Sequence, residues 1–403
     1  MGVKAGYSRT VTAGLLVKTR VVAAAFVLLA AGAAVQRVAL GPSVEQGRVY
    51  THYNNYVIFR DAFTHLRHGQ DLYSLYPDEH WDLYKYSPTF AALMAPFAPL
   101  PDAVGLVFWN VLGAGLLFLG IAGLPLGTER SRMTMAWFVA LPMLQSMQNS
   151  QSNAHVAGLV LLAAVWLERG QEMRAGLAIA LGFFVKVYGG LAIVLALLYP
   201  SRLKGVGWTI AWTVALGLVP LAFVSPSRLL DLYRSWGALL ANDQAAYTGV
   251  SAMSVLQSWF GLAPPKAAVA AAGLAITLLP LARVRAYPLV EFRMLVLAAL
   301  MLWMVAFNHK AEPNTFVIAV AGVAVWYLAG PRSWLRVTMV AAVLLLTCLS
   351  TTSIFPTVVR RALISPYSLR VVPCLIVWAI AVVEAWGSTG STRRQPVRSS
   401  STP

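Results

Sequence analysis

Long apolar runs separated by short polar segments fill most of this chain, and they constrain its fold more than any other feature. Of its 403 residues, 58% are hydrophobic and 11% are charged, whereas soluble domains are about 25% charged. A soluble fold of this composition has too few polar side chains to cover its surface. The sequence therefore predicts an all-α, polytopic integral membrane protein with roughly 10–13 transmembrane helices. The apolar runs are residues 21–40, 87–100, 103–126, 134–147, 155–167, 174–199, 206–224, 266–282, 289–306, 315–330, 334–351 and 369–387.

The distribution of charge and of cysteine argues against a nucleic-acid-binding site and a metal site. The net charge is +16, but most Lys and Arg residues lie in short loops between apolar runs. That is the positive-inside pattern of membrane proteins, so we expect no nucleic-acid partner. Cys348 and Cys374 lie inside apolar runs, where small core residues are the simplest interpretation. The sequence has no CxxC or HExxH pattern, and we expect no metal site.

The basic residues predict which segments face the cytoplasm. The basic N-terminus and the apolar run after it resemble a signal peptide, but Gln36 and Arg37 follow in place of a small-residue cleavage site, so we expect an uncleaved first span. With one crossing for each apolar run, both termini are cytoplasmic and segments 41–86, 225–265 and 307–314 lie outside. The basic residues assigned to the cytoplasm are Lys4, Arg9, Lys18, Arg20, Arg202, Lys204, Arg283, Arg285, Arg332, Arg336, Arg393, Arg394 and Arg398.

The domain organisation follows from the same pattern. Residues 1–387 are predicted to form one transmembrane domain, with segment 41–86 as a large external first loop. The tail 388–403 is rich in Ser, Thr, Arg and Pro without apolar periodicity, and we expect a disordered cytoplasmic tail.

Residues 127–205 allow two topologies. Strict alternation places the charged residues 168–174 outside and the amide-rich stretch 148–153 inside. The alternative divides run 174–199 into two half-spans that meet at Lys186, since broken helices are tolerated at membrane depth where they line a polar cavity. The sequence leaves both open.

The segment Tyr53–Pro88 is crowded with titratable side chains in an otherwise apolar chain. Aromatic and apolar residues recur at helical spacing up to Gly69, which predicts a short amphipathic helix on the membrane surface. One interpretation is a solvated loop whose aromatic residues lie at the membrane interface. The density of carboxylates beside histidines favours a functional loop. Its candidate catalytic residues are Asp61, Glu79, His80 and Asp82.

Three further polar groups interrupt apolar runs. Lys186 lies in the middle of its run, where an unpaired charge is costly, so it is expected to face a cavity or a counter-charge. Amides and one histidine break the chain at 148–155, and the stretch FNHKAEPN (307–314) forms a compact loop. Each of these groups is also compatible with an ordinary solvated turn or an interfacial side chain. Together, carboxylates that accept a proton and cations that hold a phosphate are what sugar transfer from a lipid phosphate needs.

Several motifs resemble a known family. The run Gly69–Tyr73 (GQDLY), Tyr86-Ser-Pro88 and APFAPLPDAVGLVFWNVL (95–112) resemble the start of polyprenol-phosphate-sugar-dependent transferases of the GT-C superfamily. The family of best resemblance is glycosyltransferase family 87, which includes phosphatidylinositol-mannoside mannosyltransferases. The amide break at 148–153 and Lys186-Val-Tyr188 are similar to that family's Gly-Gln-Asn and Lys-Pro or Tyr-Pro stretches. The resemblance covers the first half of the chain well and the FNHKAE stretch loosely.

The resemblance implies a GT-C-type bundle with its active site in the external first loop. It implies inverting transfer of a sugar, with mannose as a candidate, from a polyprenyl-phosphate sugar to a lipid or glycan acceptor at the non-cytoplasmic face. No nucleotide sugar, metal or other cofactor is then expected. Beyond membrane lipids and these substrates, no protein partner can be inferred.

One position departs from the family pattern. The family's catalytic Asp lies about fourteen residues before the Gly of the first motif, which corresponds to Asn55 here, and an amide is not a useful general base. The base is then Asp61, Glu79, His80 or Asp82, or the chain has lost transferase activity. The donor phosphate is expected near Lys186, His309 or Lys310. The other candidate substrate contacts are Tyr188, Gln148, Asn149, Asn55, Asn54 and Lys85.

Two other classes of function remain open from the sequence. A transporter or flippase is expected to have paired inverted halves and charges on broken helices, and only Lys186 resembles that. A non-catalytic membrane scaffold agrees with the Asn at position 55.

Overall fold

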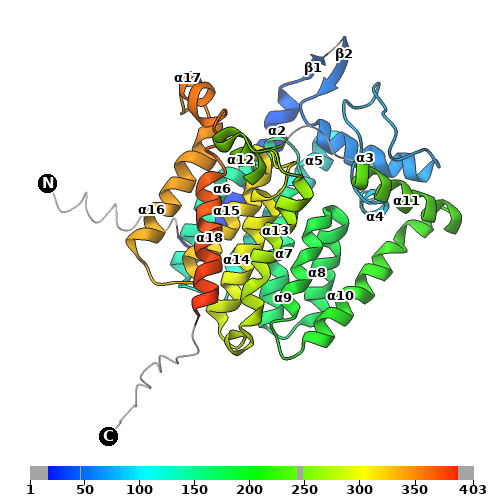
Figure 1. The fold of residues 1–403 in the computed structure, drawn as a ribbon. Coiled ribbons are helices and arrows are strands. Elements are labelled where there is room, and N and C mark those ends of the chain that lie inside the picture. The colour runs from blue at the N-terminus through cyan, green and yellow to red at the C-terminus, as the bar shows by residue number, and fades with distance from the viewer. Residues whose placement is uncertain (1–16, 46, 243–247, 389–403) are drawn as a thin grey trace, which may run out of the picture.

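The computed structural model describes residues 17–45, 47–242 and 248–388. Within them the chain is a bundle of helices with one small antiparallel sheet, in which β1 (Pro42–Glu45) pairs with β2 (Arg48–Thr51) (Figure 1). The predicted disordered tail, apart from Ser388, lies outside the described residues, as do Lys4 and Arg9. The fold confirms the predicted all-α class.

The bundle consists mainly of apolar helices. Four are long and apolar enough to cross a membrane: α2 (Thr19–Ala39), α5 (Asp102–Gly123), α10 with η2 (Arg202–Ala222) and α16 with the turns after it (Trp334–Thr351). Shorter apolar helices are α7 (Asn153–Glu168), η1 with α9 (Val187–Ala196), α13 with η3 (Lys266–Ala282), η5 with α15 (Pro313–Leu328) and α18 (Val372–Gly387). The bundle also contains α6 (Glu129–Gln148), α8 (Glu172–Val185) and α14 (Val290–Ala306).

The core lies where α14 and α15 pack against α7 and α18. Side chains on every face of α14 and α15 are buried, as expected for helices that are apolar all round. By contrast, α2 and α10 expose large apolar side chains on one face, among them Leu28, Val35 and Ile210. These exposed faces are where a membrane protein meets lipid, which fits the predicted polytopic class.

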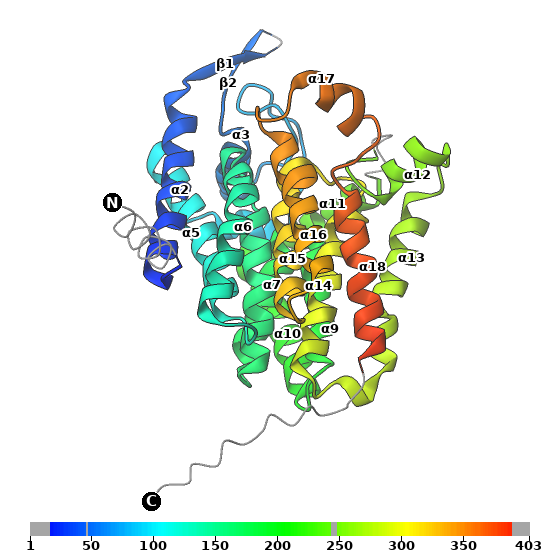
Figure 2. The same ribbon diagram turned by 90° about the vertical axis from the view of Figure 1, so that its left-hand side faces the viewer.

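Contacts between distant segments define two ends of the bundle. At the end called the polar end below, Asn55 donates a hydrogen bond to the carbonyl of Asn149 (2.9 Å), and Lys186 donates one to Asn153 (2.8 Å). Figure 2 shows β1, β2 and α17 (Thr357–Val359) gathered at the same end. The opposite end is called the basic end.

An ion pair and its neighbours mark the basic end. There Arg293 forms two hydrogen bonds with the carboxylate of Glu168 (2.6 and 2.7 Å), and Tyr199 donates a third (2.8 Å). These contacts join the end of α7, the segment after α9 and the start of α14. Helix α7 therefore runs from the polar end, where Asn153 contacts Lys186, to the basic end, where Glu168 contacts Arg293.

The predicted span 87–100 does not form a long helix. Only α4 (Pro88–Leu93) is helical there, which at 1.5 Å per residue is about 9 Å and too short for a crossing. Pro96, Pro99 and Pro101 follow, and because proline lacks the backbone N–H that a helix interior needs, they prevent the helix from continuing.

The predicted run 174–199 is two elements that meet at Lys186. Helix α8 ends at Val185, Lys186 has an extended backbone (φ −148°, ψ 122°), and η1 begins at Val187. Because Lys186 contacts the start of α7 while Tyr199 contacts the end of α7, the chain reverses at Lys186 to form a helical hairpin. Run 174–199 is thus divided at Lys186, as the second of the two topologies expects, and stretch 148–153 lies at the polar end with the first loop.

The predicted helix in the first loop is present as α3 (Asn54–Arg67). It ends before Gly69, whose φ of +71° is a conformation that glycine adopts without steric cost. However, α3 is not a surface helix with a solvated polar face, because His65 is 3% exposed and Tyr56 and Phe59 are fully buried. Helices α4, α11 (Pro226–Asn242) and α12 (Ala252–Phe260) complete the polar end.

Candidate active site

A cavity of about 330 Å³ lies at the polar end, where parts of the chain far apart in sequence meet. Its three main walls are α3 with the end of the first loop, the tip of the α8–η1 hairpin, and the segment between α14 and α15. Gln151 from the turn after α6, and Trp236 and Leu240 from α11, complete the lining. The polar or charged side chains that line it are Asn55, Asp82, Lys85, Tyr86, Gln151, Lys186, Tyr188, Asn308, His309, Lys310, Glu312 and Thr315. The cavity thus brings carboxylates, amines and amides from these parts of the chain together.

Lys186 occupies the tip of the hairpin because the helix is broken on both sides of it. Its amine donates a hydrogen bond to the side-chain oxygen of Asn153 (2.8 Å) and lies 5.9 Å from the ring centroids of Tyr86 and of Tyr188. The carboxylate of Glu312 also acts electrostatically on this amine. A lysine held in this way presents a fixed positive charge to the cavity.

Asp82 brings a carboxylate of the first loop into the same cavity. Its oxygens accept hydrogen bonds from the amine of Lys85 (2.9 and 3.0 Å) and from the backbone N–H of Leu83 (2.7 Å). The Asp82 side chain is 53% exposed, so its carboxylate remains accessible to a ligand in the cavity.

Asn55 also lines the cavity, from the face of α3 that carries Ile58 and Phe59. Its amide donates to the carbonyl of Asn149, whose own side chain donates to the side chain of Asn314 (3.0 Å). These amides join α3 to the segment before α15 through the turn after α6, and so hold two walls of the cavity together.

The segment 307–314 forms the remaining wall. The backbone N–H of Val250 donates to the carbonyl of Ala311 (2.8 Å), and that of Lys310 donates to the side chain of Asn308 (2.9 Å). The N–H of Glu312 donates to the hydroxyl of Thr315 (3.2 Å). These bonds fix the loop while His309, Lys310 and Glu312 face the cavity.

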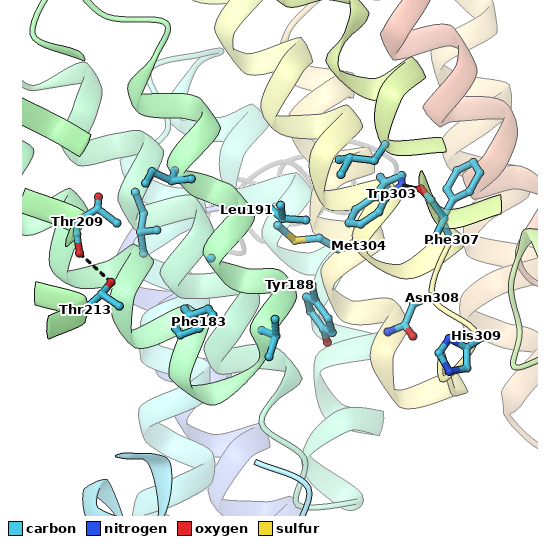
Figure 3. A pocket seen from close by; sticks show the side chains of 16 residues that line it. Phe183, Tyr188, Leu191, Thr209, Thr213, Trp303, Met304, Phe307, Asn308 and His309 are labelled. Carbon is cyan, nitrogen blue, oxygen red and sulfur yellow. Dashed lines mark hydrogen bonds between the residues drawn. The ribbon is translucent and has the colours of Figure 1, made fainter. Parts of the chain in front are cut away.

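A second, larger cavity of about 720 Å³ adjoins the first. It lies between α8, η1, α10, α13 and α14, and its walls are mostly apolar (Figure 3). Tyr188, Asn308 and His309 line both cavities. Figure 3 shows these three at one end of the space, with Leu191, Trp303 and Met304 further along it. A polar cavity therefore continues into an apolar groove among the bundle helices.

Several predicted site residues lie away from this cavity. Asp61 accepts a hydrogen bond from Arg60 (2.7 Å), which also pairs with Asp102. Burial opposes the charge of Arg60, but its hydrogen bonds to the two carboxylates raise its pKa above the usual value. Asp61 therefore belongs to a structural ion pair outside the cavity lining.

Four other predicted site residues, Glu79, His80, Gln148 and Asn54, also lie outside the polar cavity. Glu79 contacts His65 (2.8 Å), and burial lowers the pKa of His80. Gln148 donates to Gln36 of α2 (2.7 Å), and Asn54 is buried with both polar atoms of its side chain unpartnered. None of these four lines the polar cavity.

Sequence reasoning gives no role to Glu312 or to Asn153, although both belong to polar groups that it singles out. The structure brings Glu312 to the cavity and Asn153 to Lys186. Asn153 is a polar residue in the first turn of the apolar helix α7. That position in the sequence could have indicated a role for Asn153 at the site.

Comparison with protein families identifies one family. The model of glycosyltransferase family 87 matches residues 84–307, which is more than half of the chain. The match includes Tyr86, Gln151 and Lys186 but begins after Asp82 and ends before His309. No curated protein matches the chain.

Proposed function

The chain belongs to glycosyltransferase family 87, and from that premise we propose that it transfers a sugar, with mannose as the first candidate, from a polyprenyl-phosphate sugar to a lipid or glycan acceptor. The observation that carries the proposal is the union of a polar cavity, which holds Asp82 and Lys186, with an apolar groove of about 720 Å³. A water-soluble nucleotide sugar needs no such groove, whereas a lipid-linked donor does.

In this proposal the donor lies across both cavities. Its isoprenoid chain occupies the groove between α8, α10 and α14, because the apolar surface buried there favours binding. Its phosphate lies near Lys186, with Lys310 and His309 as further donors of positive charge or hydrogen bonds. As the bond to the sugar breaks, negative charge builds on the phosphate, and fixed cations stabilise it. These side chains supply the charge that a metal ion supplies in other transferases.

Asp82 is the proposed general base. The acceptor hydroxyl gives its proton to Asp82 while its oxygen bonds to the anomeric carbon, and the bond from that carbon to the phosphate oxygen breaks. The electron pair leaves with polyprenyl phosphate, and attack from the opposite side inverts the configuration. Glu312 is less suited because its charge acts on Lys186, which places it on the side of the leaving group.

The active site is proposed to face away from the cytoplasm. Arg202, Arg283 and Arg332 flank the helix ends at the basic end, and basic loops are retained in the cytoplasm. The polar cavity at the other end then opens at the external surface of the inner or plasma membrane, where membrane lipids deliver both substrates.

The test is transfer from a labelled polyprenyl-phosphate sugar by purified protein in lipid nanodiscs. Asp82→Asn is expected to lower the rate by about 10²-fold or more, because removal of a general base typically costs this much. Asp78→Asn is the matched control, since Asp78 lies on the same loop with a side chain that is 92% exposed and does not line the cavity.

Other outcomes would assign the role of general base to another residue or a different function to the protein. A normal rate in Asp82→Asn together with loss in Glu312→Gln moves the role to Glu312. Wild-type protein that translocates the labelled lipid across the bilayer without forming product would be a flippase, and protein that does neither would be a scaffold.

A further inference from the structure

Outside the cavity, three side chains of the first loop form a second cluster: His65 on α3, and Glu79 and His80 on the segment after it. One nitrogen of each imidazole and one carboxylate oxygen lie within 4.8 Å of one another. Nε2 of His65 is 2.8 Å from a carboxylate oxygen of Glu79, and the centroids of the two imidazole rings are 6.3 Å apart. The cluster therefore joins two parts of the first loop.

His80 is the member of the cluster that has a buried ring nitrogen without a partner, although its ring also lies beside Tyr76 and interacts with the backbone of Asp82. Its side chain is 1% exposed, and its Nδ1 is buried without a hydrogen-bond partner. His65, by contrast, contacts Glu79 and stacks on Tyr76 with 3.9 Å between ring centroids. A buried polar atom without a partner is unfavourable unless a ligand pairs with it.

We propose that His65, Glu79 and His80 bind one divalent transition-metal ion, with zinc as the best match. Two imidazole nitrogens and a carboxylate oxygen are a known zinc ligand set, in which water takes the fourth position. Ligand atoms at about 2.0–2.2 Å from zinc lie roughly 3.3 Å apart, so atoms within 4.8 Å of one another need only small side-chain adjustments to surround one ion, and Glu79, which is 44% exposed, has room to adjust. The charge of Asp61, which acts on His80, adds to the attraction for a cation.

The ion would fasten the segment that supplies Asp82 to the active site. His65 belongs to α3, whereas His80 precedes Asp82 by two residues, so one metal ion fixes that segment against the helix. The ion lies away from the proposed reacting atoms and has a structural role. The site goes beyond the proposed function and does not depend on it, because metal binding is measured without any transfer reaction.

The experiment measures zinc in protein purified without a polyhistidine tag. The protein in nanodiscs is treated with a chelator, dialysed against zinc chloride, washed, and analysed by mass spectrometry of the metal. Wild type is expected to retain about one equivalent of zinc, as a site with three protein ligands does. Glu79→Gln and His80→Gln are expected to retain almost none.

The controls are His52→Gln and His68→Gln, which remove histidines of the same loop outside the cluster and are expected to keep the zinc. If His80→Gln does not fold, Glu79→Gln still decides, because its side chain is partly exposed. Equal zinc in wild type and in folded Glu79→Gln would overturn the proposal, as would wild type that retains no stoichiometric zinc.

Discussion

Position 55 shows how the helical period decides which carboxylate reaches the cavity. Asn55 faces the cavity together with Ile58 and Phe59, three and four residues further on, which is the spacing of one helix face. Asp61 is six residues from Asn55, or about 240° around the helix at 100° per residue. Its carboxylate instead accepts a hydrogen bond from Arg60, which also pairs with Asp102. The types of residue in the site were predictable from the sequence. The sequence named Asp82 only as one of four candidate bases, because Asp82 lies beyond α3 in a loop without periodicity.

Removing the positive charge of Lys186 is predicted to slow sugar transfer. Lys186→Met is expected to lower the transfer rate by about 10²- to 10³-fold, because it removes one fixed cation from the charge that develops on the leaving phosphate. Methionine is unbranched like lysine and only one atom shorter, so the packing of the hairpin tip is expected to survive. Lys204→Met, at an exposed position on α10, is the control and is expected to leave the rate unchanged. The measurement is the single-turnover rate with labelled donor, and equal rates for the two variants would remove Lys186 from the mechanism.

At the scale of elements, hydropathy located most helices but not the two irregular ones. Apolar runs marked α2, α5, α7 and α14 to within a few residues, because burial or lipid contact along a whole helix leaves a continuous signal. The prediction of a span at run 87–100 was wrong because it rested on apolar composition alone, whereas three prolines prevent a long helix there. After Arg174, run 174–199 has no charged residue except Lys186, so a single span and a hairpin have the same composition. Contacts in the folded chain distinguish them.

The close packing of the hairpin leads to an element-scale prediction. A Cβ atom on Gly189 would lie 2.6 Å from the carbonyl oxygen of Gly182 on α8, whereas a Cβ on Gly182 meets nothing closer than 3.7 Å. Gly189→Ala is therefore expected to force the two elements apart, to destabilise the fold by about 1–3 kcal/mol, and to lower transfer by moving Lys186 and Tyr188.

Gly182→Ala is the matched control from the same contact. It is expected to be neutral or to stabilise by about 0.5–1 kcal/mol, because alanine favours a helix interior over glycine. Thermal unfolding in nanodiscs and the transfer rate check both variants. Two variants of equal stability and rate would mean that the hairpin does not pack as described.

At the scale of the whole molecule, the two ends of the bundle differ in chemistry, and this difference predicts its orientation. The polar end holds the cavity and the cluster of His65, Glu79 and His80, whereas Arg202, Arg283 and Arg332 flank the helix ends at the other. Because α7 runs from the polar end to Glu168 at the basic end, Arg169, the residue after it, also lies at the basic end. The sequence left the side of Arg169 open, because the two topologies differ in whether run 174–199 is one span or two half-spans that meet at Lys186.

Labelling of single cysteines in intact cells tests this orientation. Cys348 and Cys374 are buried and are replaced by Ala in the background, and cysteine is then introduced at Ser74, Arg332 or Arg169. Ser74→Cys is expected to react with a membrane-impermeant maleimide, and Arg332→Cys to react only after the cells are permeabilised, because basic loops are retained in the cytoplasm.

Arg169→Cys separates the two topologies, since strict alternation leaves it outside. We expect it to behave as Arg332→Cys does, and labelling of Arg169→Cys in intact cells would contradict the hairpin as a double crossing. Protection of Ser74→Cys in intact cells would instead place the polar cavity in the cytoplasm, where a donor presented at the external surface could not reach Lys186.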